Sequence, residues 1–453
     1  MKLSNIEVKE KKKRKRTLNF QKIFNLISFT FILACCIFYG GRFISLYLEN
    51  NKSEELKLLA DNIKDNNVEN ENFNNINGNR YFKGENPDNY LEYSNLLWRI
   101  IRINSDNTVT IVLDSPITAL AAGTEKTYTK TYLHIWLNDQ NKEYTGILEN
   151  SLNKKDAYLT YTNTCYDIID NTKNITCKKT IENTLITVPS LSDYVNTGAH
   201  EGFLNTGHYF YLANMNKENK LWYIDEDGKV GNSDGTDIIG IKPVITIKKN
   251  TTLVNGNGTK ENPYKIETEN GLLGSYVKLG EDIWRVYQIH EDTLKLSLDS
   301  HLTLNSNEVK YKYSTSGYYH NDEKQNSLAY YLKNTYLPTL SYSNIINETT
   351  YSNGIYSNVT NYNYIDVLKT QIETKVTTLS LGDIIITPTN TNYFSTTGVS
   401  EDGNQIYVIR DNFEIYTKVS TSNLNVVPVI SIKRNILTSG EGTIESPLEV
   451  SNE

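Results

Sequence analysis

The chain has 453 residues with 53 acidic and 46 basic side chains, so its formal net charge is −7. Residues 1–22 hold nine of the basic side chains and only two Glu, a net of +7, which leaves −14 for the remainder. An acidic body of this size is a poor partner for a polyanion, so we expect no nucleic-acid binding.

An apolar run from Ile23 to Tyr39 follows the basic segment. Extended to Leu48, it reaches the roughly 20 residues that a helix needs to cross a bilayer. No small-x-small cleavage site ends it cleanly, and a cleaved signal peptide is the alternative. The sequence predicts a basic cytoplasmic tail at 1–22 and an uncleaved transmembrane signal anchor at 23–48 that contacts the lipid bilayer. The positive-inside rule then predicts a single-pass cell-membrane protein with its C-terminal part outside.

Residues 49–80 are polar and rich in Asn, which predicts a stalk or linker. Leu56, Leu59 and Ile63 recur at helical spacing and predict a short helix within it. Two turns of apolar stripe are too short for a coiled coil, so we interpret this helix as a solvated stalk.

The rest of the chain repeats itself. Three residues mark the repeat, because Trp98, Pro243 and Pro263 recur after 186, 185 and 184 residues as Trp284, Pro428 and Pro447. The blocks around them also match, with "IKPVITIKKN" at 241–250 returning as "VVPVISIKRN" at 426–435. The sequence therefore predicts two tandem domains, repeat 1 at 81–267 and repeat 2 at 268–453.

Each repeat combines strands with small helices. Period-two alternation after each Trp-Arg strand predicts a half-buried strand, with its apolar face at Val109, Ile111 and Leu113 in repeat 1 and Leu294, Leu296 and Leu298 in repeat 2. Apolar residues at helical spacing predict a short helix at 133–137 and another at 328–332. "DEDG" at 225–228 predicts a hairpin turn. The predicted fold class is α+β, with a mostly antiparallel sheet in each repeat.

The closing blocks carry a resemblance. "FYLAN" at 210–214, the Asp-Gly hairpin and "GIKPV" at 240–244 resemble an uncharacterised tandem surface-domain family of low-GC Gram-positive bacteria. That family distantly resembles the C-type-lectin-like fold of formylglycine-generating enzymes, which implies a bacterial source and a lectin-like domain. Repeat 2 departs from the pattern, with Asn425 and Val427 in place of Gly240 and Lys242. The enzyme's activity is not implied, because it needs a reactive cysteine arrangement that this chain does not show.

Two groups of residues are candidates for special chemistry. Cys165 and Cys177 are the only cysteines outside the apolar run, and their spacing in an oxidising compartment predicts a structural disulfide; a free pair or a weak metal site are the alternatives. The acidic stretch at 225–237 is a weak candidate for calcium, with the carboxylates of Asp225, Asp227, Asp234 and Asp237. Its spacing is not that of an EF-hand, and ordinary hairpin turns are the competing interpretation.

The sequence contains no HExxH or P-loop motif, so we expect no enzyme, no catalytic residue and no cofactor other than the candidate calcium. The 33 tyrosines suit glycan or protein contacts, although an AT-rich genome also explains them. The sequence predicts a membrane-anchored cell-surface protein with two non-catalytic recognition domains for an unknown glycan, cell-wall polymer or protein. A structural component of the cell envelope is the alternative, and a divergent enzyme is a weaker one.

Overall fold

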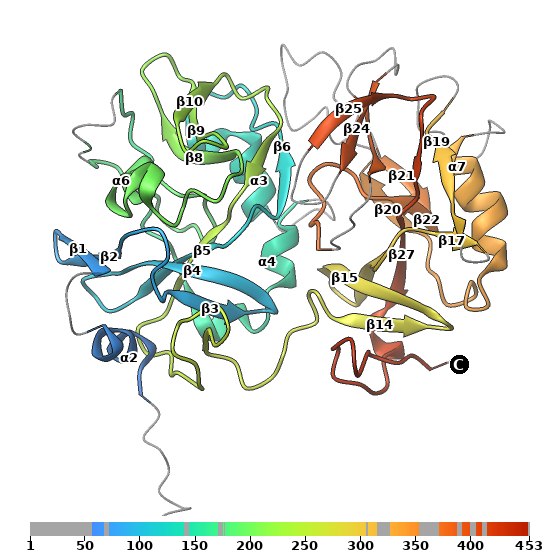
Figure 1. The fold of residues 1–453 in the computed structure, drawn as a ribbon, viewed down its shortest axis with the longest axis horizontal. Helices are drawn as coiled ribbons and strands as arrows, with labels where there is room; N and C mark the ends of the chain where they lie inside the picture. Colours follow the sequence, from blue (N-terminus) through green and yellow to red (C-terminus); the bar gives the residue numbers. More distant parts are fainter. Residues whose placement is uncertain are drawn as a thin grey trace, which may run out of the picture. The chain divides into compact units, whose positions relative to one another are not determined.

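A computed structural model shows the folded part of the chain (Figure 1). The chain divides into two units, Met1–Leu56 and Lys57–Glu453. The structure describes the following residues, all of them in the second unit: 57–67, 72–139, 145–170, 175, 177–304, 307–314, 327–352, 371–386, 392–398, 405–409 and 415–451.

Two sheets form the framework of repeat 1. The first has the order β1-β2-β4-β5-β12-β7, with β3 pairing to β4 and β13 to β3, and the second has the order β10-β9-β8-β11-β6. The strands are β1 (Phe73–Ile76), β2 (Asn79–Phe82), β3 (Tyr90–Tyr93), β4 (Leu96–Ile103), β5 (Val109–Leu113), β6 (Thr118–Leu120), β7 (Leu159–Thr160), β8 (Phe210–Met215), β9 (Leu221–Ile224), β10 (Val230–Ser233), β11 (Ile239–Ile241), β12 (Val244–Ile247) and β13 (Tyr264–Lys265).

Repeat 2 has two matching five-stranded sheets and two small ones. Their orders are β14-β15-β16-β27-β22 and β19-β26-β23-β24-β25, with the pairs β17-β18 and β20-β21 beside them. The strands are β14 (Tyr276–Leu279), β15 (Asp282–His290), β16 (Thr293–Leu298), β17 (Thr303–Leu304), β18 (Asn307–Glu308), β19 (Lys310–Lys312), β20 (Thr349–Ser352), β21 (Gln371–Thr374), β22 (Val376–Thr378), β23 (Tyr393–Gly398), β24 (Gln405–Ile409), β25 (Ile415–Val419), β26 (Asn423–Asn425) and β27 (Pro428–Lys433).

The helices are short. The α-helices are α2 (Leu59–Asn66), α3 (Tyr132–Asn138), α4 (Ile147–Ser151), α5 (Lys155–Tyr158), α6 (Leu191–Asn196) and α7 (Leu328–Tyr331). Single turns of other helix types are η2 (Tyr128–Lys130), η3 (Ala199–Glu201), η4 (Leu332–Tyr336), η5 (Leu337–Thr339) and η7 (Arg434–Ile436), of which η4 has π-helical hydrogen bonding.

The same strand pairings occur in both repeats. The antiparallel ladder β4-β5-β12 in repeat 1 corresponds to β15-β16-β27 in repeat 2. The first pair of each ladder has a register shift at the same place, Ile100/Arg102 in one and Val286/Gln288 in the other. Gly240 pairs in parallel with Phe210, and Asn425 pairs in parallel with Tyr393. These pairings assign an equivalent residue in repeat 2 to most strand positions of repeat 1.

Buried contacts join the two repeats within one compact unit. The indole N–H of Trp136 donates to the carbonyl of Gly382 at 3.1 Å, and the amide of Gly382 donates to the Thr118 hydroxyl at 3.2 Å. One hydrophobic core contains residues of both repeats, while a second core lies within repeat 2. Because one core crosses the boundary between the repeats, they form a single structural unit.

The predicted α+β class is wrong, because the described chain is mostly β-sheet. The apolar spacing at 133–137 and 328–332 does form helices, but they are only seven and four residues long. Strands therefore supply most of the framework, and the helices only cover its edges.

The segment predicted as a solvated stalk also differs. Its helix exists as α2, but Leu59, Ala60 and Ile63 are buried in the core that repeat 1 contributes to. The Leu59 amide donates to the Thr251 carbonyl at 2.9 Å, and β1 and β2 extend the first sheet. Three apolar residues on one helical face are sufficient to dock a helix on a neighbouring sheet. The sequence pattern alone does not distinguish such a docked helix from a helix whose apolar stripe is solvated.

The prediction of a membrane-spanning helix is corrected. Within the residues that the structure describes, no helix is long and apolar enough to cross a membrane. The basic tail at 1–22 and the signal anchor at 23–48 lie outside those residues. The single-pass membrane localisation is therefore withdrawn.

Candidate functional site

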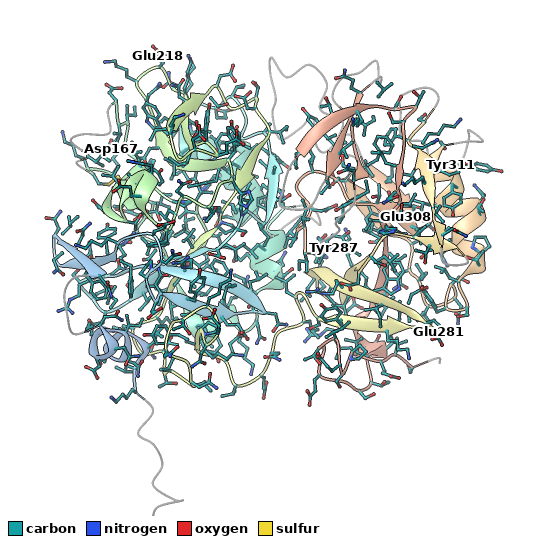
Figure 2. The ribbon with its side chains drawn as sticks, viewed as in Figure 1. Asp167, Glu218, Glu281, Tyr287, Glu308 and Tyr311 are labelled. Atoms are coloured by element: carbon teal, nitrogen blue, oxygen red, sulfur yellow. A yellow bond between two sulfur atoms is a disulfide. The ribbon has the colours of Figure 1, made fainter. Side chains whose placement is uncertain are left out.

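A pocket of about 570 Å³ lies in repeat 2. The turn between β14 and β15, the chain that leaves β16 and the helical stretch α7–η4–η5 form most of it, and Ile444 completes the described lining. Figure 2 shows Glu281 at the tip of the β14–β15 hairpin. Ligand sites in proteins commonly enclose about 300–1,000 Å³, so this pocket has the size of a binding site for a small molecule.

One wall of the pocket is aromatic and hydroxyl-rich. Tyr331, Thr335, Tyr336 and Thr339 lie on one face of the α7–η4–η5 stretch and line the pocket. The ring of Tyr331 stacks on Tyr311 with centroids 4.6 Å apart, which fixes its orientation. A π-helical turn at η4 changes the helical spacing at this point, and such turns often occur at functional sites.

Carboxylates also line the pocket. They are those of Glu281, Asp282 and Asp299, and the described lining has no Lys or Arg. Its imidazole, that of His301, lies 3.5 Å from the Glu308 carboxylate. Asp282 accepts a hydrogen bond from the Tyr342 hydroxyl, which in turn accepts one from the Trp284 indole at 3.3 Å. Asp299 lies 3.5 Å from the Arg285 guanidinium, behind the lining. Burial raises the pKa of Asp299, and the nearby Arg285 opposes that rise.

The smaller pocket, of about 200 Å³, lies in repeat 1 between the β1–β2 hairpin, the 163–180 loop and the start of α6. Its rim is rich in amides, with Asn77, Asn79, Asn163 and Asn196. Its floor is a buried ion pair between Arg102 and Asp193. Because Asp193 neutralises Arg102, the floor offers a ligand no net charge.

Cys165 and Cys177 form a disulfide in this smaller pocket, where both line the wall. We expect the double variant Cys165→Ser/Cys177→Ser to lose about 3 kcal/mol of unfolding free energy, because the bridge restricts a loop of roughly a dozen residues in the unfolded chain. Urea unfolding with and without reductant measures this loss. Reductant should lower the unfolding midpoint of the wild type and leave that of the variant unchanged. An unchanged wild-type midpoint would contradict a stabilising bridge.

The acidic stretch at 225–237 forms a hairpin and a turn, with β9 and β10 paired from Leu221 to Ser233. Each carboxylate is used locally: Asp225 accepts from the Lys229 amide, Asp234 from Thr236, and Asp237 from the Ser233 hydroxyl at 2.6 Å. Asp227 pairs with the Lys229 ammonium. No group of three or more metal-ligating side chains occurs among the described residues. The structure therefore does not bring the four candidate calcium ligands together.

Each repeat buries one Asp beside one cation, but the cation comes from different strands. In repeat 1, Arg102 on β4 pairs with Asp193. In repeat 2, the equivalent of Arg102 is Gln288, and its cross-strand partner is the buried Lys295. The Lys295 charge acts on the buried Asp383, which corresponds to Asp193. Both Asp residues accept from a Ser three positions earlier, Ser190 or Ser380. In repeat 2 the positive charge therefore lies on the strand that pairs with the equivalent of the Arg102 strand, while the Asp has the same position in both repeats.

Lys242 of the "GIKPV" block is another buried cation of repeat 1. Within the described residues its ammonium makes two long hydrogen bonds, 3.5 Å to the Leu204 carbonyl and 3.4 Å to the Thr206 hydroxyl, and it lies over the Phe210 ring. Burial lowers the pKa of Lys242 to about 7, opposed by Asp114. Val427 occupies the equivalent position in repeat 2, so this cation is particular to repeat 1.

No family model, curated protein or solved structure matches the chain. Nothing in these comparisons supports the lectin-like domain expected from the closing blocks, so we interpret the site from its own residues.

Sequence reasoning missed the pocket of repeat 2. Its residues come from separate segments of the chain, at 281–283, 298–309 and 331–340 and at Ile444, and none of them forms a motif. The one available signal was "YYLKNTYLPT" at 330–339, where polar Tyr and Thr side chains follow the helix predicted at 328–332. The prediction of that helix did not show that polar side chains of this stretch line a pocket.

Proposed function

We propose that this is a non-catalytic recognition protein that binds a saccharide in the pocket of repeat 2. The observation that carries the proposal is the composition of that pocket, in which tyrosine rings and carboxylates line one cavity. A sugar ring has apolar C–H faces that pack on aromatic rings, and hydroxyl groups that donate to carboxylates. The geometry of the pocket suits both kinds of contact at once.

The rigidity of the site supports recognition. Tyr331 is held by its stack on Tyr311, and Asp282 is held by Tyr342. Asp299 is within reach of Arg285. Side chains that are fixed before binding lose little conformational entropy when the ligand arrives, which favours affinity.

The first test is binding of the full chain to a panel of soluble oligosaccharides of neutral, acidic and amine-bearing types, measured by calorimetry. We expect saturable binding to at least one type, and about tenfold weaker binding by Tyr331→Ala, because it removes one aromatic wall. Tyr161→Ala is the matched control, since Tyr161 is an exposed tyrosine of repeat 1. It should bind like the wild type.

Two results would contradict the proposal. Failure of every saccharide to bind would overturn it and favour the alternative of a role in assembly. Release of new reducing ends from a bound oligosaccharide would overturn its non-catalytic part.

A further inference from the structure

We infer that the saccharide bound by repeat 2 carries a protonated amine. The inference rests on the proposed function and narrows its ligand class. It starts from the charge of the pocket, whose described lining has the carboxylates of Glu281, Asp282 and Asp299, neither Lys nor Arg, and one imidazole, that of His301, which has the Glu308 carboxylate beside it at 3.5 Å. A bound ligand removes water from these groups, and a carboxylate without a positive partner loses free energy when it is desolvated.

The three carboxylates differ in how far they are already compensated. Asp299 has Arg285 behind it, at 3.5 Å. Asp282 has the neutral hydroxyl of Tyr342, which satisfies one lone pair but no charge. Glu281 is exposed at the hairpin tip, and its side chain makes no hydrogen bond or ion pair within the described residues (Figure 2). The excess of negative charge is therefore concentrated at the β14–β15 turn, and that is where a positive group of the ligand is best placed.

A second, independent observation points to a ligand. Tyr336 lines the pocket and is 91% buried, at a relative exposure of 9%. Within the described residues its hydroxyl makes no hydrogen bond of good geometry, and the polar group beside it is the Tyr342 hydroxyl, which already donates to Asp282. The Tyr336 hydroxyl is therefore incompletely satisfied, and a hydroxyl of the ligand can supply the missing hydrogen bond.

The aromatic wall favours the same ligand. Tyr331 and Tyr336 line the same pocket as the three carboxylates. A cation close to a tyrosine face gains from the negative charge density of the ring, in addition to its pairing with a carboxylate. An N-acetylated amine is neutral and gains neither contribution, while an acidic sugar meets repulsion from Glu281 and Asp282. Among saccharides, a free amino sugar therefore complements the pocket best.

The experiment compares three oligomers of one length with the full chain at pH 6, where the amine is protonated. They are a β-1,4-linked glucosamine trimer, its fully N-acetylated form, and the corresponding glucose trimer. We expect the glucosamine trimer to bind about tenfold or more tightly than either neutral trimer, with an affinity that falls as salt is raised.

Charge variants locate the effect. Glu281→Gln keeps the size of an exposed side chain and removes one charge from the pocket. We expect it to weaken the glucosamine trimer about threefold to tenfold and to leave the glucose trimer unchanged. Glu218→Gln is the control, because Glu218 is also an exposed carboxylate, on the β8–β9 turn of repeat 1, where it pairs with Lys220 (Figure 2). Asp299→Asn serves as a second variant inside the pocket.

The outcomes separate the two proposals. Equal affinity for the amine and its N-acetylated form overturns the inference and leaves saccharide recognition intact. A loss that is the same in Glu281→Gln and Glu218→Gln overturns the assignment to this pocket. If none of the trimers binds, and no other saccharide of the panel binds, the proposed function itself is overturned.

Discussion

Replacing Asp193 by Asn should lower the unfolding free energy by about 3–5 kcal/mol. The substitution removes one member of a buried pair and leaves the Arg102 guanidinium, which is 4% exposed, without its counter-charge. Removing one partner of a buried pair is far more destabilising than replacing both, because the remaining charge stays in a poorly solvated place. Asn104 and Asn163 still accept from Arg102, but neutral amides do not compensate its charge.

Two controls make this expectation specific. Asp383→Asn removes the equivalent carboxylate of repeat 2, whose pKa is raised by burial, so loss of its charge should be less costly. Glu269→Gln breaks the exposed pair between Lys154 and Glu269 and should not change the unfolding midpoint measurably. Urea unfolding at pH 7 compares the three variants. A loss in Asp193→Asn no larger than that in Asp383→Asn would contradict the importance of the Arg102 pair.

Replacing Lys242 by Met should raise the unfolding free energy by about 1–4 kcal/mol at pH 7, since an apolar side chain of similar length replaces a poorly compensated buried cation. The folded pKa is about 7 and the ordinary value is 10.5. Between these values the unfolded chain holds a proton that the folded chain has released, so wild-type stability rises with pH, by up to roughly 1.4 kcal/mol per pH unit. The advantage of the Met variant is therefore largest at pH 7 and below, and it disappears as the pH approaches 10.5.

The measurement is the difference in unfolding free energy between the Lys242→Met variant and the wild type at several pH values from 6 to 9.5. The contributions of the other titratable groups to the unfolding free energy cancel in this difference, because both proteins contain them. A variant that is less stable than the wild type at every pH would show that the contacts with Leu204 and Thr206 outweigh the cost of the buried charge.

Local structure was predictable where pattern and turn chemistry agreed. The strand predicted at 109–113 is confirmed as β5, although all five of its residues are buried and not one face alone. The hairpin around "DEDG" is confirmed by the pairing of β9 with β10. Alternation and Asp-Gly turns act over a few residues, so the sequence contains all the information that they need. The docking of α2 was not predictable in the same way, because it depends on which distant surface receives Leu59 and Ile63.

The pocket of repeat 2 and the joint between the repeats depend on long-range contacts. Glu281 and Tyr336 line the same pocket, although more than 50 residues of chain separate them. The Trp136 indole donates to the Gly382 carbonyl across a separation of 246 positions. Arg102 pairs across strands with Thr110, and Gln288 pairs with Lys295. The equivalence of these two pairs can be recognised only after the strand register is known. Such features arise from tertiary packing, which neither composition nor periodicity encodes in a single sequence.

The most direct test is a crystal structure of the full chain with the glucosamine trimer. The expected result is one sugar ring in the pocket of repeat 2, packed on Tyr331 or Tyr336, with its ammonium within about 4 Å of the Glu281 or Asp282 carboxylate. A trimer bound elsewhere on the protein, with this pocket empty, would contradict the assignment.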